Sequence, residues 1–547
     1  MRVTVSQPRG ETAPGTELLI DQSSENSGRN LSAYQHVKHG DGRILLVPQP
    51  SHADRNDPLR WPLWKKWLAF GNALFFAFNG AMTGPMMAGG MLQLSAFFNS
   101  PLADITYSNG ATLICQGFGT LVWMPLAVRF GRRPVYLASN LLMGIACVWV
   151  AVASEKTYPV FVLGRAFLGL WEAPIEAIVP STVTDLFYLH ERGEMISMYG
   201  LSVLGGNELG PLVSAYIIQA LSMRWAFFIV AMIIGLNAVT MFFFMPETKF
   251  MGARPVISPA GDYPVIAAKA EIGEKASDNK KITTANAACS TVETEAGPII
   301  PKKSYLQELA FCSVTNPNVS LWKVFTRPFI LMAYPTVLWA SLVYGMSLSW
   351  NLILGALVAQ LFGTPPYNFL SGSQGLIFLS PLIGSLVATY LCGALADRVA
   401  TFFTIRNKGI REPEMRLPTV IVAAILTFIG ALISGLTYHY KTHWAGPIVG
   451  FGVLSAGAQM GATLAMSYAL DCHIELSAEI MVTISCLKSA VAWIWTWCIN
   501  DWVEHDGLLV VFMVIATLNV LVYASTFVFH FWGKRIRLWI HQNQFLE

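Results

Sequence analysis

The sequence predicts an all-α membrane protein whose twelve transmembrane helices form two pseudo-symmetric halves of six helices each. First, 54% of the 547 residues are hydrophobic and only 13% are charged, against about 25% charged residues in an ordinary soluble domain. Second, apolar segments of about 20 residues, the length that crosses a bilayer, recur in two groups of six, separated by a polar stretch. Third, a basic hinge follows the second segment of both groups, as a duplicated six-helix unit would leave it.

The apolar segments divide the chain into a first half at 65–245 and a second half at 327–532. The first six predicted spans are 66–94, 106–128, 134–153, 159–181, 195–219 and 224–245. The second six are 327–360, 370–396, 417–437, 444–470, 479–502 and 507–532. One chain therefore holds both halves, and we expect it to function as a monomer.

The polar parts of the chain are predicted to lie outside the membrane. Residues 1–64 are rich in Ser, Gly, Pro, Asp and His, which predicts a disordered tail because such a composition buries no core. Residues 246–326 are mixed in charge and lack periodicity, which predicts a flexible linker between the halves. Residues 533–547 form a short basic tail. The first thirty residues lack the features of a signal peptide, so the first span is expected to direct insertion.

The distribution of Lys and Arg predicts the orientation in the membrane. The hinge after the second span carries Arg129, Arg132 and Arg133, and the loop after the eighth span is also basic. The alternate loops 99–105, 362–369 and 500–506 contain neither Lys nor Arg. Because cytosolic loops carry the excess of positive charge, both termini are expected in the cytosol.

Charged residues inside the predicted span 159–181 indicate a function, because each costs about 2.5–3.5 kcal/mol at the bilayer centre. Arg165, Gly169, Glu172 and Glu176 are separated by 4, 3 and 4 residues. At about 100° per residue they fall within roughly 60° of one another on one helix face. Both glutamates can therefore share a lumen with Arg165 as their counter-charge, which predicts proton coupling. The alternative is that either glutamate is a water-exposed structural acid near the outer end of the span.

Several classes of function are excluded by composition. A net charge of +3 with scattered basic residues gives no footprint for nucleic acid. The eight cysteines form no CxxC pair, and the neighbours Cys472 and His473 point apart on a helix, so no metal site or cofactor is expected. The spans hold no convergent pair of Asp and no His cluster, so an enzyme is not expected, and the modest tails argue against a non-transporting sensor.

The hinge after the second span resembles a motif of the major facilitator superfamily, Gly-x-Leu-Ala-Asp-Arg-x-Gly-Arg-Arg. Met124 stands where that motif has Gly, and Val128 stands where it has Asp. The resemblance implies the major facilitator fold, but the missing Asp puts the family's outward-facing lock in doubt. Asp397 and Arg398 after the eighth span keep that part of the motif and could compensate. The positions that fit are Leu126, Ala127, Arg129, Gly131, Arg132 and Arg133.

Two further blocks look like those of fungal members of the twelve-span drug:proton antiporter family within that superfamily: Asp185-Leu186-Phe187-Tyr188 with His190-Glu191-Arg192-Gly193, and Pro246-Glu247-Thr248 at the end of the sixth span. In the fourth span, Arg165 and Gly169 fit the family's pattern, which has an acid at Glu176; this makes Glu176 the first candidate for the proton carrier and Glu172 the second. In the fifth span, Gly206, Gly210 and Pro211 fit an antiporter pattern of small residues that allow close helix approach. The motif residues expected to act in gating also include Asp185, Glu191 and Arg192.

Two more intramembrane charges have open interpretations. Glu208, beside Gly210 and Pro211 at an expected kink, is a further candidate for proton coupling; the alternative is a salt bridge or a helix-end carboxylate. Lys488 could hydrogen-bond a substrate carboxylate, anchor a carboxylate of another span, or extend to the cytosolic face.

Polar and aromatic residues inside the spans are candidates for a substrate cavity, although most large rings in such proteins face lipid or pack spans together. Large rings with a few dispersed dipoles suit amphipathic, partly aromatic compounds. The candidates are Asn79, Gln116, Asn207, Tyr344, Trp350, Asn351, Gln374, Gln459, Lys488 and Trp493.

The sequence as a whole predicts a proton-driven transporter that exports small organic molecules such as a drug, a toxin or a secondary metabolite. The only driving force expected is the proton gradient, and the partners expected are the small-molecule substrate and the lipid bilayer. The resemblance favours the plasma membrane over the vacuolar membrane. The alternative function is proton-coupled import of a polyamine, an organic cation or another nutrient, which membrane acids beside aromatic residues would serve equally well.

Overall fold

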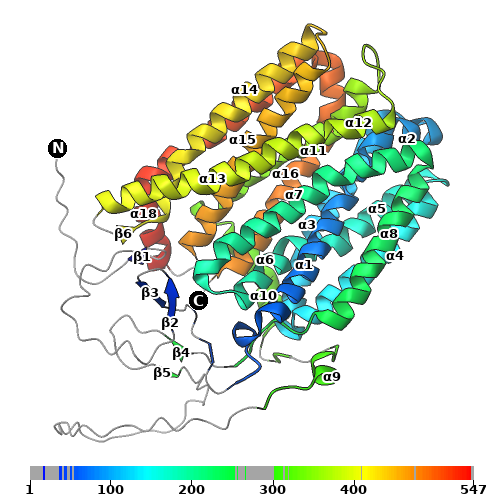
Figure 1. Cartoon of the computed structure of the whole chain (residues 1–547). Helices are drawn as coiled ribbons and strands as arrows, with labels where there is room; N and C mark the ends of the chain where they lie inside the picture. Colours follow the sequence, from blue (N-terminus) through cyan, green and yellow to red (C-terminus); the bar gives the residue numbers. More distant parts are fainter. Residues whose placement is uncertain are drawn as a thin grey trace, which may run out of the picture.

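The computed structural model shows a bundle of long, roughly parallel helices (Figure 1). Their apolar sequences explain this arrangement, because helices satisfy every backbone polar group internally and so can cross a bilayer. The structure describes residues 17–18, 36–39, 42–45, 48, 50–51, 54–252, 255–256, 265–266, 301–311, 315–317, 319–407, 410–473 and 476–543.

The first half is built from helices between Leu63 and Phe244. Within it, α4 packs against α8 and α5, and α1 packs against α7, around a core that includes Phe76 and Tyr136. The elements are α1 (Leu63–Thr83), η3 (Pro85–Gly90), α2 (Met91–Phe98), α3 (Leu102–Phe130), α4 (Arg132–Ala153), α5 (Tyr158–Glu172), α6 (Pro174–Leu186), α7 (Leu189–Ala220) and α8 (Met223–Phe244).

The second half repeats this plan with helices that begin at Pro335. Here α14 packs between α15 and α17, and α13 packs against α15. The elements are α11 (Pro335–Phe362), α12 (Ser371–Ile377), α13 (Leu379–Arg406), η4 (Pro413–Thr419), α14 (Val420–His439), α15 (Ala445–Cys472), α16 (Ser477–Asp506), α17 (Leu508–Ala524) and α18 (Thr526–Asn543).

Ten helices in the described part of the chain are long and apolar enough to cross a membrane. The predicted spans 66–94 and 159–181 are not among them. The helix α1 is less apolar because it carries Lys66, Asn72 and Asn79. It ends at Thr83, and Gly84 separates it from η3, which begins at Pro85 and leads into α2. The helices α5 and α6, of 15 and 13 residues, meet at a break before Pro174. The all-α fold is confirmed, and the count of twelve stays a prediction.

The two halves meet along two seams. The helix α3 of the first half packs against α16 of the second, and α7 packs against α12 and α13. Where α12 and η3 approach α7, the backbones are very close: a Cβ added at Gly375 would lie 2.6 Å from the Cβ of Ala215, and one added at Gly89 would lie 2.7 Å from it. Figure 1 shows α2 and α12 at one end of the bundle and α18 at the other.

The segments outside the spans differ in part from their predictions. Short strands occur in the expected tail. The strand β2 (His36–His39) pairs with β3 (Gly42–Leu45), and β1 (Glu17–Leu18) pairs with β6 (Ile410–Arg411), which follows α13. In the expected linker, β4 (Pro255–Val256) pairs with β5 (Val265–Ile266). The remainder of the predicted tail and most of the predicted linker, including 267–300, lie outside the described residues.

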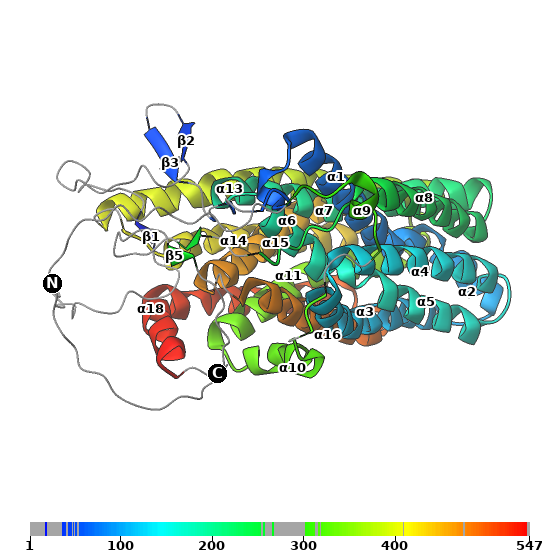
Figure 2. The same cartoon turned by 90° about the horizontal axis from the view of Figure 1, so that it is seen from below.

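The end of the predicted linker is docked on the first half. The Lys65 Nζ lies 2.7 Å from the Glu308 Oε2, and the Tyr305 hydroxyl donates to the Phe243 carbonyl at 2.9 Å. These contacts arise around α9 (Tyr305–Glu308). The helix α10 (Leu321–Leu331) then lies against α3 and α16, along the seam between the halves (Figure 2). This end of the predicted linker is therefore held against the first half.

Part of the predicted basic tail is helical, because helix α18 continues to Asn543. A buried ion pair holds it: the guanidinium of Arg537 donates to both carboxylate oxygens of Glu414, at 2.8 and 2.7 Å. The ammonium of Lys534 reaches Glu412 at 2.7 Å. Both acids belong to the loop that precedes α14, so these contacts fasten α18 to its own half.

Candidate functional site

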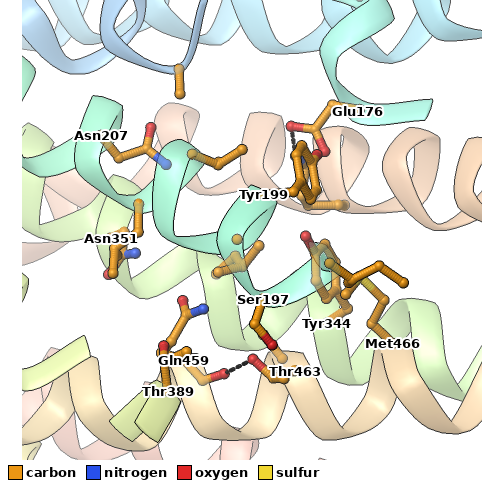
Figure 3. Close-up of a pocket in the computed structure, with 18 of the residues that line it drawn as sticks. Glu176, Ser197, Tyr199, Asn207, Tyr344, Asn351, Thr389, Gln459, Thr463 and Met466 are labelled. Carbon is orange, nitrogen blue, oxygen red and sulfur yellow. Dashed lines mark hydrogen bonds and ion pairs between the residues drawn. The ribbon is translucent and has the colours of Figure 1, made fainter. Parts of the chain in front are cut away.

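A cavity of about 1060 Å³ lies between the two halves. Its lining includes residues from α1, α3, α6 and α7 on one side and from α11, α13, α15 and α16 on the other. Figure 3 shows its polar side chains converging from both halves, among them Glu176, Asn207, Tyr344 and Gln459. A mostly apolar pocket with a few convergent polar groups is the usual form of a small-molecule site.

At one end the halves are joined by direct hydrogen bonds, and we call this the closed end. The Asn500 amide donates to the Thr106 hydroxyl at 2.6 Å, and the Gly372 N–H donates to the Gln219 side chain at 2.7 Å. Each bond joins the first half to the second. The loops 99–105, 362–369 and 500–506, which lack Lys and Arg, lie at this end, together with loops that carry Lys156 and Lys441.

At the opposite end the cavity lining reaches the surface, and we call this the basic end, because it carries the Arg-rich hinges. The lining there includes Arg192 and Glu194 from α7 and Asp397 and Arg416 from the second half. The Asp397 side chain is 63% exposed. A solute can therefore enter the cavity from the basic end, between the two halves.

The acids predicted in the fourth span both line the cavity. The break before Pro174 means that they lie on two consecutive helices, with Glu172 ending α5 and Glu176 in the first turn of α6. Glu172 is 3% exposed and accepts a hydrogen bond from the Thr83 hydroxyl. The Glu176 Oε1 lies 2.5 Å from the Lys488 Nζ, so this ion pair bridges the two halves.

The structure gives Arg165 a different place from the predicted one. Its guanidinium is fully buried and donates to the carbonyls of Thr83 and Gly84, at 2.7 and 3.2 Å, and to the Asn109 side chain at 2.7 Å. These acceptors become available because α1 ends at Thr83. The cation that contacts Glu176 is Lys488, which anchors a carboxylate of another span, one of its predicted alternatives.

Glu208 lies on α7, is 3% exposed and lines the cavity. Among the residues that the structure describes, no cation and no hydrogen-bond donor contacts its carboxylate. The predicted alternative of a salt bridge is therefore not what the structure shows. Helix α7 continues from Leu189 to Ala220 through Pro211, so the expected kink does not end the helix.

Six of the ten predicted cavity residues line the cavity: Gln116, Asn207, Tyr344, Asn351, Gln459 and Lys488. The other four lie outside its lining, because each is enclosed by its own half or by a seam. Trp350 is fully buried against Phe512, with ring centroids 5.3 Å apart. Gln374 donates to the Phe369 carbonyl beside α12 at 2.9 Å. Asn79 is fully buried in α1, and Trp493 packs beside Gly110 in the α3–α16 seam.

Sequence reasoning missed several lining residues that Figure 3 labels. Helical periodicity could have found two of them, because Thr463 and Met466 lie four and seven residues after Gln459 on the same face of α15. Tyr199 and Ser197 lie eight and ten residues before Asn207 on α7, about 80° to either side of it, so that residue does not select them. Thr389, on α13, had no such signal.

The motif residues of the first half form a network at the basic end. The Arg132 guanidinium lies 2.8 Å from Asp185, which joins α4 to α6. The backbone N–H groups of Arg132 and Arg133 donate to the Glu247 carboxylate at 2.9 and 3.1 Å. Gly131 has a φ of +93°, and an added Cβ there would lie 2.3 Å from a Glu247 oxygen, so glycine is required. The buried Arg133 guanidinium donates to carbonyls that include that of Phe242, at 2.8 Å.

The remaining motif residues lie at the same end. Asp397 and Asp471 both pair with Arg416, at 2.9 and 3.0 Å, within the second half. That Asp397 and Arg398 compensate for the missing Asp of the first hinge stays a prediction. In the first half, Arg192 donates to the carbonyls of Thr184 and Phe187, at 2.9 and 3.3 Å, and the Glu191 carboxylate accepts from the Tyr188 N–H at 3.3 Å. Arg398 is exposed, and the Arg129 guanidinium lies over Phe130.

Two helical halves around a central cavity define a membrane transporter of the alternating-access class. The sequence profile of the Major Facilitator Superfamily (MFS) matches residues 69–492 of this chain. The protein therefore belongs to the Major Facilitator Superfamily; it is an integral membrane transporter of small molecules and not an enzyme.

Fungal relatives match almost the whole chain. An uncharacterized MFS-type transporter from Schizosaccharomyces pombe is 27% identical, and the match covers 97% of this chain and 93% of that protein. Protein HOL1 from Saccharomyces cerevisiae is 24% identical over 96% of this chain and 95% of its own. The MFS-type transporter penM from Penicillium rubens is 27% identical over 81% of this chain and 80% of its own.

Solved structures share the fold. The proton:xylose symporter XylE bound to 6-bromo-6-deoxy-D-glucose has a TM-score of 0.57 at 14% identity, covering 86% of this chain and 97% of that chain. XylE from E. coli in a partially occluded inward open conformation has a TM-score of 0.58 at 12% identity, covering 85% of this chain and 98% of that chain. At such low identity the likeness concerns the fold alone.

Proposed function

We propose that this protein is a proton-coupled transporter that exports small organic molecules, such as a drug, a toxin or a secondary metabolite, by alternating access. The observation that carries the proposal is the central cavity, which is open between the halves at the basic end, hydrogen-bonded shut at the closed end, and lined by three buried carboxylates. Buried acids in a membrane lumen are costly and characteristic of proton pathways.

The ion pair between Glu176 and Lys488 is the proposed coupling element. It joins α6 of the first half to α16 of the second at 2.5 Å. A proton on Glu176 would remove its attraction for Lys488, and so would release this contact between the halves. Glu172, one turn earlier and bonded to Thr83, is the second proposed proton carrier.

The orientation follows from the charge of the loops. The basic end carries the hinges at Arg132 and Arg416, and the positive-inside rule therefore assigns that end to the cytosol. Because α1 begins and α18 ends at that end (Figure 1), both termini would be cytosolic. A cavity open to the cytosol is the state that loads a substrate for export. We propose the plasma membrane as the site of action.

The test is the accumulation of labelled cationic, neutral and anionic amphiphiles in cells that lack their own efflux pumps, with and without this protein. We expect lower accumulation of at least one class in cells that contain the protein, and recovery of accumulation when a protonophore collapses the proton gradient. Raised accumulation would instead establish the alternative, import of a nutrient such as a polyamine or an organic cation. Unchanged accumulation of every class, with the protein present in the membrane, would contradict the proposal.

A further inference from the structure

Among the described residues, Glu208 is the one buried acid on the cavity wall that has neither a cation nor a hydrogen-bond donor beside it; Glu194, which also has neither, is exposed to water. Glu176 has Lys488 at 2.5 Å, Glu172 has the Thr83 hydroxyl, and Asp397 and Asp471 share Arg416. Among the described residues, Glu208 has neither a cation nor a hydrogen-bond donor. It is nevertheless 97% buried, since its relative exposure is 3%, and it lines the cavity.

A buried carboxylate without a partner is unstable as a bare anion, because transfer out of water costs a charged group far more than a neutral one. At this depth in the cavity, a proton or a neighbouring cation would therefore stabilise the carboxylate. Among the described residues that line the cavity, Lys488 is the only cationic side chain away from the basic end. It is already paired with Glu176. The cation that fits Glu208 must therefore come from outside the protein.

The rest of the wall suits an organic cation with an apolar body. The lining holds six carboxylates and three cationic side chains, so its fixed charge favours cations. Tyr199 and Tyr344 line the same cavity (Figure 3), and aromatic rings attract cations through their faces. Apolar residues such as Met91, Leu352 and Phe378 line it as well, and can cover the apolar part of a ligand.

We propose that Glu208 binds the positively charged group of the substrate, and that the substrate class is an organic monocation with an apolar body. This inference rests on the proposed function, because it names what the exporter carries. One carboxylate cannot hold a proton and pair with a cation at once, so the binding of one displaces the other. Proton and cation therefore compete at Glu208, in addition to the coupling proposed at Glu176 and Lys488.

The test is binding to the purified full-length protein in detergent, measured by equilibrium dialysis with labelled tetraphenylphosphonium. Tetraphenylborate has the same shape and the opposite charge, and is the matched probe. We expect the protein to bind the phosphonium at least about tenfold more tightly than the borate. Glu208→Gln should weaken phosphonium binding at least about tenfold, since a charge-assisted contact is lost, whereas Glu208→Asp should retain most of it.

Glu504→Gln is the control, because Glu504 is an exposed acid outside the cavity lining; it should bind the phosphonium as the parent does. Equal binding of the two probes, no binding of the phosphonium, or unchanged binding in Glu208→Gln would each overturn the proposal. The preference between the probes needs no variant, so the test holds even if Glu208→Gln fails to fold. The binding experiment uses no proton gradient, so its outcome is independent of the transport assay. If the protein binds the phosphonium as expected but exports nothing, only the proposed function is contradicted.

Discussion

The ion pair between Glu176 and Lys488 is nearly enclosed, with side-chain exposures of 8% and 13%. Removing one partner of such a pair leaves the other charge buried and unpaired, at a cost of about 3–5 kcal/mol. A proton taken up by Glu176 neutralises the carboxylate and weakens the pair in the same way. Under the proposed function, the binding of a proton at this residue would be linked to the separation of the two halves.

Glu176→Gln tests this linkage, because the amide keeps the shape of the side chain but cannot carry a proton. We expect proteoliposomes containing this variant to lose accumulation driven by a proton gradient and to keep substrate exchange. The matched control is Glu155→Gln, which removes an acid from a surface pair with Arg224. Proton-driven accumulation by Glu176→Gln at the parent rate would refute the assignment.

The sequence predicted the acids of the site better than their partners. The spacing of Glu172 and Glu176 placed both in the lumen, and both line the cavity. The partner of Glu176 lies 312 residues away on another helix, so no local pattern could select Lys488. Arg165 was predicted to be the counter-charge of these acids because it lies on the same predicted helix face. The carbonyls that bind it are available only because α1 ends there, which the spacing does not reveal.

His473, just after α15, gives a prediction of pH dependence. Burial, and to a lesser degree the positive charge of Arg537, lowers the pKa of His473 from 6.5 to about 4. Its ring nitrogen lies 3.0 Å from the Thr336 hydroxyl. Below pH 6.5 this histidine is protonated in the unfolded chain, whereas in the folded protein it stays neutral down to about pH 4. Acidification from pH 6.5 towards pH 4 therefore lowers the stability of the folded state.

We therefore expect the thermal unfolding midpoint of the purified protein to fall between pH 7.5 and pH 5, and to fall less in His473→Asn. His439→Asn serves as the control, because His439 is exposed at the end of α14. An identical pH dependence in His473→Asn and in the parent would show that His473 contributes nothing to it.

At the scale of the elements, small residues set how closely α1 and α7 approach. A Cβ added at Gly206 would lie 2.4 Å from the Phe78 carbonyl oxygen, and one added at Gly210 would lie 2.6 Å from the Met82 side chain. The resemblance to an antiporter motif therefore corresponds to a physical contact here. The contact positions α7, which carries Asn207 and Glu208 to the cavity.

Gly206→Ala should consequently destabilise the protein by about 1–3 kcal/mol, as overpacking of a close contact does, and should reduce transport. Gly235→Ala is the matched control, because an added Cβ at Gly235 on α8 meets nothing within 4 Å. Thermal unfolding of the two variants in detergent checks the difference. A midpoint for Gly206→Ala at or above that of Gly235→Ala would contradict a tight α1–α7 contact.

The positions of the helices were more predictable than their breaks. The length of the apolar segments alone located most spans, because a segment that crosses the bilayer must be apolar over the thickness of its hydrocarbon core. The break before Pro174 follows from proline at the first helical position, yet Pro125 and Pro211 lie within continuous helices. Proline therefore marks where a helix is weakened, and tertiary packing decides whether it ends. No periodic sequence pattern indicated that α9 and α18 dock on the bundle, because their docking depends on single ion pairs such as that of Glu308 with Lys65.

For the whole molecule, the arrangement of the halves determines which side of the membrane reaches the cavity. Hydrogen bonds such as that from Asn500 to Thr106 join the halves at the closed end, while Glu194 is an exposed residue of the lining at the basic end. From the charge of its loops, we expect the basic end to face the cytosol. Alternating access requires that a solute reach the cavity from one side at a time.

Cysteine substitution at Glu194 and at Glu504, with a membrane-impermeant maleimide as the reagent, tests orientation and opening together. We expect Glu194→Cys to be labelled in inside-out vesicles and not in intact cells. Glu504→Cys, near the closed end, should show the reverse. The unsubstituted protein measures the background from its own cysteines, of which Cys147, Cys392 and Cys472 are buried. Labelling of both variants from the same side would contradict the assignment of the two ends. Labelling of Glu194→Cys from outside the cell would reverse the orientation, and the open cavity would then be in the state that loads a substrate for import.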